Sequence, residues 1–265
     1  MALTPAAAMT VTAMINQKGG VGKTTDTLNL GGALAEYGRR VLLIDFDPQG
    51  NLSTALKVEH LDEDAPNSLP KLMIGGGDIR DAIIHPLPGI DLIPASLDMF
   101  FLPGRLREQK MGELRLQRLL AQIEGEYDHV LLDCRPAIDD DTDAALAAAT
   151  DAVIPMDVDT FSIRAVHLLL AQAAKTMNAL GRKPMDYRGI VINRIDRPFS
   201  DFNQSVYDAL FTLPVPVKGE VPVRSKIAEA REIGGQPVCM YAPKDEAAKI
   251  FRNMIVSLGF VEAAA

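Results

Sequence analysis

Short, mostly apolar runs recur along the chain, and stretches with helical spacing of apolar residues separate them. The runs span residues 11–15, 41–44, 90–93, 130–132, 153–156 and 189–192. Runs of this length are typical of strands that are buried on both faces of a parallel sheet. Their alternation with helical segments predicts an α/β fold with a doubly wound, mostly parallel β-sheet flanked by helices.

Helices are predicted over residues 24–37, from 51 to 58, and over 78–84, 105–124, 139–149, 161–180, 201–211 and 245–258. The segment 59–77 is polar and contains proline and glycine, so it is the least regular part of the chain. The last predicted helix is amphipathic, but its polar side mixes Lys249 and Arg252 with Asp245 and Glu246. A helix that lies on a membrane surface has a polar face rich in Lys and Arg, so packing against the core is favoured.

The length and composition favour one domain. The chain has 265 residues, of which 48% are hydrophobic, and no apolar run approaches the roughly 18 residues of a membrane span. Residues 1–10 contain no Lys or Arg and do not form a secretory signal. We therefore expect a disordered tail over residues 1–10 and a single domain over residues 11–265.

A glycine-rich segment follows the first apolar run. The sequence N-Q-K-G-G-V-G-K-T-T covers residues 16–25. Glycines allow successive backbone N–H groups to curl around an anion, and the start of the next helix adds partial positive charge. The expected phosphate-binding residues are Gly19, Gly20, Val21, Gly22, Lys23, Thr24 and Thr25. Lys23 is placed to reach the outer phosphates, and the Thr24 hydroxyl is placed to bind Mg²⁺.

Carboxylates follow two of the predicted strands. Asp45 and Asp47 end the second strand, and their i, i+2 spacing directs both to the same side. Asp133 ends the strand over residues 130–132. Carboxylates at the carboxyl edge of a parallel sheet, beside a phosphate loop, suit magnesium coordination and the activation of water.

The charge and the cysteines restrict the remaining classes of function. The net charge is −8, but residues 181–265 carry 12 Lys and Arg against 10 Asp and Glu. A globally acidic protein can still bind nucleic acid through a local basic patch, and the last third of the chain is where such a patch would lie; ordinary surface variation explains the asymmetry equally well. Cys134 and Cys239 are far apart and form no C-x-x-C pair, which fits a reduced cytoplasm and gives little support to a metal or iron–sulfur site.

The glycine-rich segment departs from the standard phosphate-binding loop, because Gln17 stands in place of the first glycine and a second lysine, Lys18, precedes Gly19. This K-G-G-x-x-K-[ST] pattern closely resembles the deviant Walker A loop of the ParA/MinD group of P-loop ATPases. Further matches are L-L-I-D-F-D-P-Q-G-N (42–51), L-L-D-C-R-P (131–136), V-I-P (153–155) and V-P…E-A…P-V (221–238). Over most of residues 11–260 the chain is similar to ParA (Soj-type) partitioning ATPases.

The resemblance implies roles for particular residues. ATP would close two protomers into a sandwich, with Lys18 of each reaching the phosphates of the other. Lys23 and the loop N–H groups would hold the β- and γ-phosphates, and Thr24 and Asp133 would hold Mg²⁺. Asp47 would orient the attacking water, with Asp45 in support. Asn193 and Pro222 would flank the base.

The resemblance also implies partners. The ATP-bound homodimer would bind DNA non-specifically, and a ParB-type centromere-binding protein would stimulate slow hydrolysis and release it. Arg224 and Lys226 are the candidate DNA contacts. A cytoplasmic, nucleoid-associated protein without stable membrane association is expected.

Some features leave alternatives open. N-R-I-D at residues 193–196 approximates the guanine-reading N-K-x-D motif, so ATP is favoured but GTP stays possible. Asp26 stands where the family usually has a small hydroxyl residue. It lies two positions after Thr24 on a helix, so its side chain is expected to point away from the metal. Its negative charge near the loop would nevertheless weaken phosphate affinity. Arg135, two positions after Asp133, stands where the ParA family commonly has proline. A MinD-like or cargo-positioning ATPase acting on a membrane or protein matrix is the main alternative, and a carboxylate-activating ligase is the third.

Overall fold

One eight-stranded sheet forms the centre of the structure, a computed structural model that describes residues 8–62, 65–136 and 140–262. The strand order is β3-β4-β2-β5-β1-β6-β7-β8. Every neighbouring pair is parallel except β3 and β4, which are antiparallel. The strands are β1 (Thr10–Met14), β2 (Val41–Phe46), β3 (Ile84–Leu87), β4 (Ile90–Ile93), β5 (His129–Cys134), β6 (Asp151–Asp157), β7 (Asp186–Ile195) and β8 (Val217–Pro222). The predicted doubly wound parallel sheet is confirmed.

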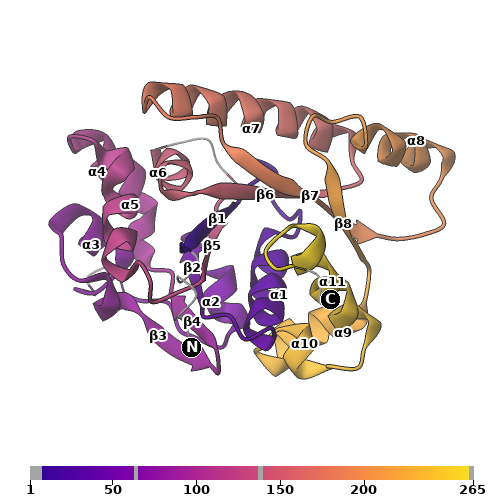
Figure 1. Cartoon of the computed structure of the whole chain (residues 1–265), viewed down its shortest axis with the longest axis horizontal. Helices are drawn as coiled ribbons and strands as arrows, with labels where there is room; N and C mark the ends of the chain where they lie inside the picture. Colours follow the sequence, from indigo (N-terminus) through magenta and orange to yellow (C-terminus); the bar gives the residue numbers. More distant parts are fainter. Residues whose placement is uncertain (1–7, 63–64, 137–139, 263–265) are drawn as a thin grey trace, which may run out of the picture.

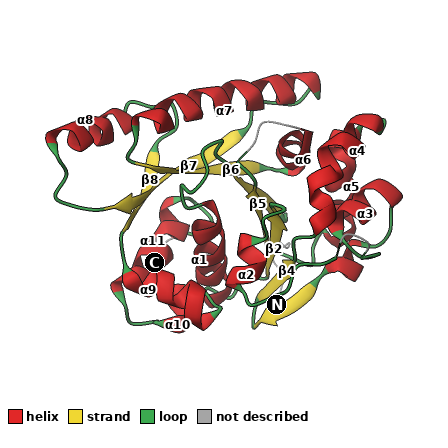
Figure 2. Ribbon diagram, turned by 180° about the vertical axis from the view of Figure 1, so that it is seen from behind, coloured by secondary structure: helices red, strands yellow, loops and turns green. Residues whose placement is uncertain are grey.

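Helices cover both faces of this sheet (Figures 1 and 2). One face carries α1 (Lys23–Glu36), α2 (Asn51–Ala55), α9 (Ser225–Glu229), α10 (Val238–Tyr241) and α11 (Glu246–Ser257). The other carries α3 (Leu69–Gly75), α4 (Leu102–Glu108), α5 (Arg115–Leu120), α6 (Asp140–Ala148), α7 (Thr160–Ala179) and α8 (Asp201–Leu210). A π-helical turn, Ala230–Gly234, continues α9.

Alternate residues of the central strands belong to the two separate cores. In β2, Leu42 and Ile44 pack on the α3–α8 side, whereas Val41 and Leu43 pack on the side of α1 and α11. Because side chains alternate across a strand, a strand that is covered on both faces must be apolar throughout. This explains the unbroken apolar runs in the sequence. In α11, Phe251 and Ile255 are fully buried, which confirms that this amphipathic helix packs in the core.

Several local predictions are wrong. Residues 105–124 do not form one helix: α4 ends at Glu108, Met111 adopts a left-handed conformation (φ 55°), and α5 begins at Arg115. The segment 59–77, expected to be irregular, contains α3. Residues 79–82 form a 3₁₀ turn that leads into β3, whereas the sequence predicts a helix over 78–84; the apolar spacing does not indicate this strand. Thr10 begins β1, so the expected tail is too long by at least this residue; residues 1–7 and 139 lie outside the described residues.

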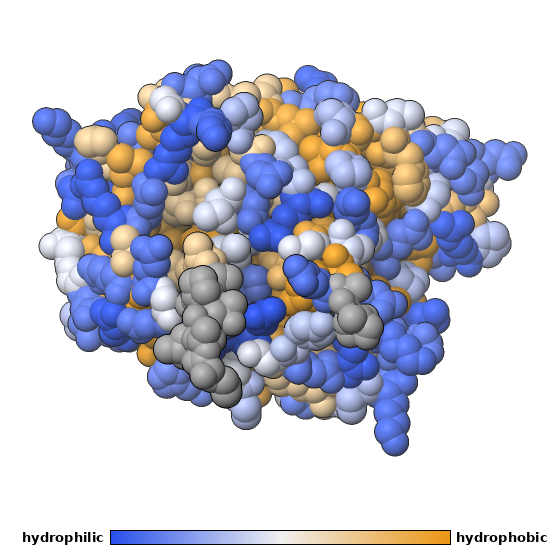
Figure 3. All heavy atoms as spheres, viewed as in Figure 1, coloured by the Kyte–Doolittle hydropathy of each residue, from blue (hydrophilic) through white to orange (hydrophobic). Residues whose placement is uncertain are grey.

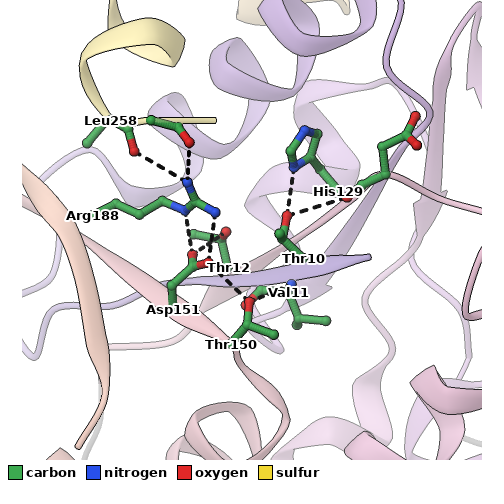
Figure 4. A network of polar contacts seen from close by, with 10 residues as sticks. Thr10, Val11, Thr12, His129, Thr150, Asp151, Arg188 and Leu258 are labelled. Carbon is green, nitrogen blue, oxygen red and sulfur yellow. Dashed lines mark hydrogen bonds and ion pairs between the residues drawn. The ribbon is translucent and has the colours of Figure 1, made fainter. Parts of the chain in front are cut away.

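A polar network joins the amino ends of the central strands to the end of the chain (Figure 4). Asp151 accepts hydrogen bonds from the Thr12 hydroxyl at 2.6 Å and from Arg188 Nε at 2.7 Å. The Arg188 guanidinium also donates to the Gly259 carbonyl at 2.8 Å and lies 4.2 Å from the centre of the Phe260 ring. Arg188 and Asp151 are thus a mostly buried ion pair with its hydrogen bonds satisfied, the arrangement in which burial of charge is tolerated.

Lowering the pH should destabilise the protein through His129, whose Nδ1 lies 2.7 Å from the Thr10 hydroxyl. Burial, together with the charge of Arg188, lowers the pKa of His129 to about 4. The unfolded chain takes up the proton first, near its ordinary pKa of about 6.5, so stability falls as pH drops from about 6.5 towards about 4. We expect His129 to account for about 1–2 kcal/mol of lost unfolding free energy at about pH 5.

Urea unfolding of the wild type and of His129→Gln at about pH 7 and pH 5 tests this expectation. The variant cannot titrate in this range, so its loss on acidification should be smaller. An equal loss in both proteins would assign the acid sensitivity to other groups, because all the other titrating side chains are common to the two proteins.

Candidate functional site

The glycine-rich segment forms a loop between β1 and α1. Gly20 and Gly22 have φ values of 75° and 101°, which an L-residue with a side chain adopts only with strain. Gly22 caps α1 without a side-chain hydrogen bond, so the first backbone N–H groups of the helix remain available. The loop therefore has the geometry of an anion site at a helix N-terminus.

Lys23 lies inside this loop. Its ammonium donates to the carbonyl oxygens of Asn16 at 3.1 Å and Lys18 at 3.2 Å. Burial lowers the pKa of Lys23, and the neighbouring Asp133, Cys134 and Asp47 partly offset this effect. A buried ammonium that is held only by carbonyl oxygens is well suited to receive a more strongly charged acceptor such as a phosphate.

Asp45 and Asp133 lie side by side at the carboxyl ends of neighbouring strands. They are register partners in β2 and β5, and they point to the same face as α1. Both are buried; Asp45 accepts hydrogen bonds from the Ser53 backbone N–H and hydroxyl, each at 2.7 Å. Within the part of the chain that the structure describes, neither oxygen of Asp133 has a hydrogen-bond partner of ordinary geometry.

Two buried neighbouring carboxylates with one nearby ammonium, that of Lys23, are a fit for a divalent cation. Burial, and then the charge of Asp45, raises the pKa of Asp133 to about 8, although the Thr24 hydroxyl and Lys23 act in the opposite direction. Burial likewise raises the pKa of Asp45 to about 6. Ser53 donates hydrogen bonds to one carboxylate oxygen of Asp45. Asp133 therefore has more carboxylate oxygen atoms available to a metal than Asp45 has. Among the described residues no three His, Cys, Asp or Glu side chains are arranged to hold a metal by themselves.

Two cavities meet at the loop. The first has a volume of about 530 Å³ and is lined by Gly20, Lys23, Thr24, Thr25 and Asp47, among others. The second, of about 190 Å³, contains Asn193, Pro222 and Arg224. Gly22, Thr25, Arg194 and Arg231 line both. The larger volume is within the usual range for small-molecule sites, and the arrangement places a second chamber beyond the phosphate loop.

Lys18, unlike Lys23, does not line the first cavity. Its ammonium is 2.8 Å from both carboxylate oxygens of Asp157 and 3.4 Å from Asp159. Despite burial, the hydrogen bonds from Lys18 and Ser162 lower the pKa of Asp157. The Lys18 side chain is 27% exposed, so it lies at the rim of the site.

Comparison with known proteins places this site in a family. An AAA domain model matches residues 9–183. The chromosome partitioning protein ParA of Caulobacter vibrioides is 34% identical over 245 residues, which cover 87% of this chain and 86% of that protein. The chain belongs to the ParA/Soj-type family of P-loop ATPases.

Solved structures share the fold of this chain. A cobyrinic acid a,c-diamide synthase from Mycobacterium smegmatis, with a bound ATP analogue and magnesium, has a TM-score of 0.77 and 28% identity over 92% of this chain and 91% of that one. The ATP complex of a Cyanothece McdA variant shares the fold, with a TM-score of 0.83 and 22% identity over 97% of this chain and 99% of that one. ATP and Mg²⁺ are the cofactors of this ParA/Soj-type ATPase, as expected.

Asp26 lies beneath the loop of this ParA/Soj-type ATPase, not on the surface. It is fully buried, and its Oδ2 accepts a hydrogen bond from Asn193 Nδ2 at 2.7 Å. Burial raises its pKa well above the ordinary value; the Asn193 hydrogen bond acts against this effect and the charge of Asp133 adds to it. Asp26 thus faces Asn193 at the end of β7 and lies within the electrostatic influence of Asp133.

The two candidate DNA contacts lie near the second cavity. Arg224 precedes α9 and lines this cavity, and Lys226 forms an ion pair with Glu229 at 2.5 Å. Lys226 therefore has a local counter-ion. Their contact with DNA stays a prediction.

Sequence reasoning missed several residues of the site. Asp157 ends β6 in the way that Asp45 and Asp133 end their strands, and this position is the signal that could have identified it. Arg194 has a left-handed backbone (φ 56°), and its guanidinium reaches Gly20. Arg231 is on the π-helical turn, and Lys57 donates to the Glu232 carbonyl at 2.5 Å; neither has a local sequence signal.

Proposed function

We propose that the protein is an ATP-dependent DNA-partitioning ATPase that switches between a monomer and an ATP-bound sandwich homodimer. The dimer binds non-specific DNA on the nucleoid, and a ParB-type partner stimulates hydrolysis and release. The chromosome-partitioning role of the Caulobacter relative supports this proposal. Domain organisation is proposed as one ATPase domain over residues 11–265.

Lys18 is the observation that carries the proposal. A lysine that only helped to bind nucleotide in its own protomer would line the phosphate cavity, as Lys23 does. Lys18 is held at the rim by Asp157 and Asp159, both partly exposed. Ion pairs at such positions are worth about 1 kcal/mol or less, so Lys18 can leave them at small cost and reach the phosphates of a second protomer.

The other site residues would bind the phosphates, hold Mg²⁺ and orient the attacking water. The loop N–H groups and Lys23 bind the phosphates, and Thr24 and Asp133 would hold Mg²⁺, which neutralises charge that develops on the phosphates. Asp47 lines the cavity with one carboxylate oxygen bound by the Gln49 N–H at 2.9 Å, which fixes its direction. It would accept a hydrogen bond from the attacking water and align it.

Gel retardation of a random-sequence DNA duplex with ATP, ADP or no nucleotide tests the proposal. We expect retardation with ATP only, and loss of at least about tenfold in affinity between about 50 and 200 mM salt, because phosphate contacts release counterions. Absence of retardation with ATP at low salt, under conditions in which ATP is bound, would reject the DNA matrix.

The main alternative is a MinD-like or cargo-positioning ATPase that uses a membrane or a protein surface as its matrix, and the structure bears on the membrane. Within the described residues no helix is long and apolar enough to span a bilayer, and the apolar side of α11 is buried in the core. On the face shown in Figure 3, hydrophilic residues interrupt the apolar ones. Sedimentation with anionic vesicles and ATP, in parallel with the DNA assay, separates the two functions. The name of the M. smegmatis relative is that of an amide-forming enzyme, and such an enzyme should bind neither matrix.

A further inference from the structure

We propose that Asp26 sets the base specificity of the nucleotide site by fixing the orientation of the Asn193 side chain. The inference rests on the proposed function in one respect, namely that the second cavity receives the base of the bound nucleotide. Asp26 touches no nucleotide in this proposal. It is a positioning residue that acts through Asn193.

The contact between the two residues is short and buried. Asn193 Nδ2 donates to Asp26 Oδ2 at 2.7 Å, and Asn193 and Asp26 are 3% and 0% exposed. The second oxygen, Asp26 Oδ1, is buried and has no hydrogen-bond partner among the described residues. A carboxylate without any other hydrogen bond depends strongly on the one donor that it has, because an unsatisfied buried acceptor is costly.

The chemistry of the pair determines the orientation of the amide. Asp26 Oδ2 is the acceptor of this hydrogen bond, so it selects the NH₂ end of the Asn193 side chain. The carbonyl oxygen Oδ1 is then the end of the amide that is left for a ligand. Without such a neighbour, an Asn side chain can rotate and present either end.

The amide is also confined by the phosphate loop. A Cβ atom built on Gly22 would lie 2.6 Å from Asn193 Nδ2 and 2.7 Å from its Cγ, so the side chain lies directly against this glycine. Asn193 also lines the second cavity, together with Pro222 and Arg224. The same side chain therefore contacts Asp26 and Gly22 and borders this cavity.

A fixed carbonyl oxygen selects between purines. The 6-amino group of adenine donates a hydrogen bond and pairs with an acceptor, whereas the 6-oxo group of guanine or hypoxanthine is itself an acceptor and is disfavoured there. A site that is built around a hydrogen bond discriminates strongly against a ligand that cannot make it. The N-R-I-D segment, which approximates a guanine-reading motif, would by this arrangement read adenine.

Hydroxyl residues at position 26 would not have this effect, because a hydroxyl both donates and accepts. In Asp26→Thr, the Asn193 amide should populate both orientations. We expect the wild type to bind Mg·ADP at least about tenfold more tightly than Mg·IDP. IDP differs from ADP only in its base, at position 6 and at N1. In Asp26→Thr the ratio should fall to within about threefold.

Isothermal titration calorimetry with ADP and IDP measures this ratio without hydrolysis. Asn193→Ala should lose the preference as well, and the double variant should lose no more than either single one. Asn29→Ser is the matched control: Asn29 is a buried residue of the same helix, with hydrogen bonds to the Thr25 carbonyl and the Val238 N–H, each at 2.7 Å, and it does not line the second cavity. This variant should be less stable but keep the ratio. If Asp26→Thr does not fold, Asp26→Asn keeps the volume of the side chain and also releases the amide.

Two results would overturn the inference. One is a wild-type protein that binds ADP and IDP equally; the other is an unchanged ratio in the Asp26 variants, with both affinities lowered together as a purely structural role requires. The ratio does not depend on DNA. Failure of the DNA assay with a normal ratio would reject the proposed partitioning function alone, and the reverse pattern would reject this inference alone.

Discussion

Replacing Asp47 with alanine should reduce ATP hydrolysis by about 100-fold or more while ATP binding and ATP-dependent dimerisation remain. General-base and water-orienting groups contribute about 10²–10⁴ to rates, which sets this expectation. Asp47 lines the phosphate cavity next to Lys23, but the loop backbone, Lys23 and Thr24 provide the contacts that would hold the nucleotide. Loss of Asp47 should therefore trap the ATP-bound dimer.

Phosphate release and sedimentation velocity with ATP measure the two effects separately. Asp47→Asn serves as the matched variant, because it keeps the size of the side chain but cannot take up a proton. A rate in Asp47→Ala equal to that of the wild type would remove Asp47 from the reaction. A loss of ATP binding would instead show that the variant damages the loop.

Replacing Lys18 with alanine should abolish ATP-driven dimerisation and leave nucleotide affinity within a few-fold of the wild type. Lys18 does not line the phosphate cavity of its own chain, so its loss should affect mainly the contact with a second protomer. A charge-assisted hydrogen bond to a phosphate in a water-excluded interface is among the strongest polar contacts, so its removal has a large effect. Dimer mass with ATP and ADP affinity are the two measurements.

Two controls separate this role from a structural one. Asp157→Asn removes the ion-pair partner of Lys18 without removing the lysine, and it should retain dimerisation. If Lys18 served only to hold Asp157, both variants would fail equally. Lys57→Ala removes another lysine, one that lines the phosphate cavity and donates to the Glu232 carbonyl, and it should leave the dimer intact. Normal dimerisation of Lys18→Ala would refute the role in the second protomer.

Periodicity failed where tertiary contacts decide the local backbone. The apolar spacing over residues 105–124 fits one helix, yet the chain breaks at Gln109 to Gly112. A Cβ atom on Gly112 would lie 2.1 Å from the Leu106 carbonyl oxygen, so the chain folds back closely on α4 there. An apolar pattern reports which residues are buried, and two short helices that cover one face give the same pattern as one long helix.

The sequence by itself determined the parallel sheet, the phosphate loop and the carboxylates at its edge, because these depend on local spacing. Unbroken apolar runs indicate strands with two covered faces, and the residues that follow such strands meet at one edge. Tertiary structure alone decided which of these residues touch. It placed Lys18 on Asp157, 139 residues away, and Asn193 on Asp26, 167 residues away. Strand order and the packing of α1 on the sheet create these contacts, and neither is encoded in the local pattern of the residues involved.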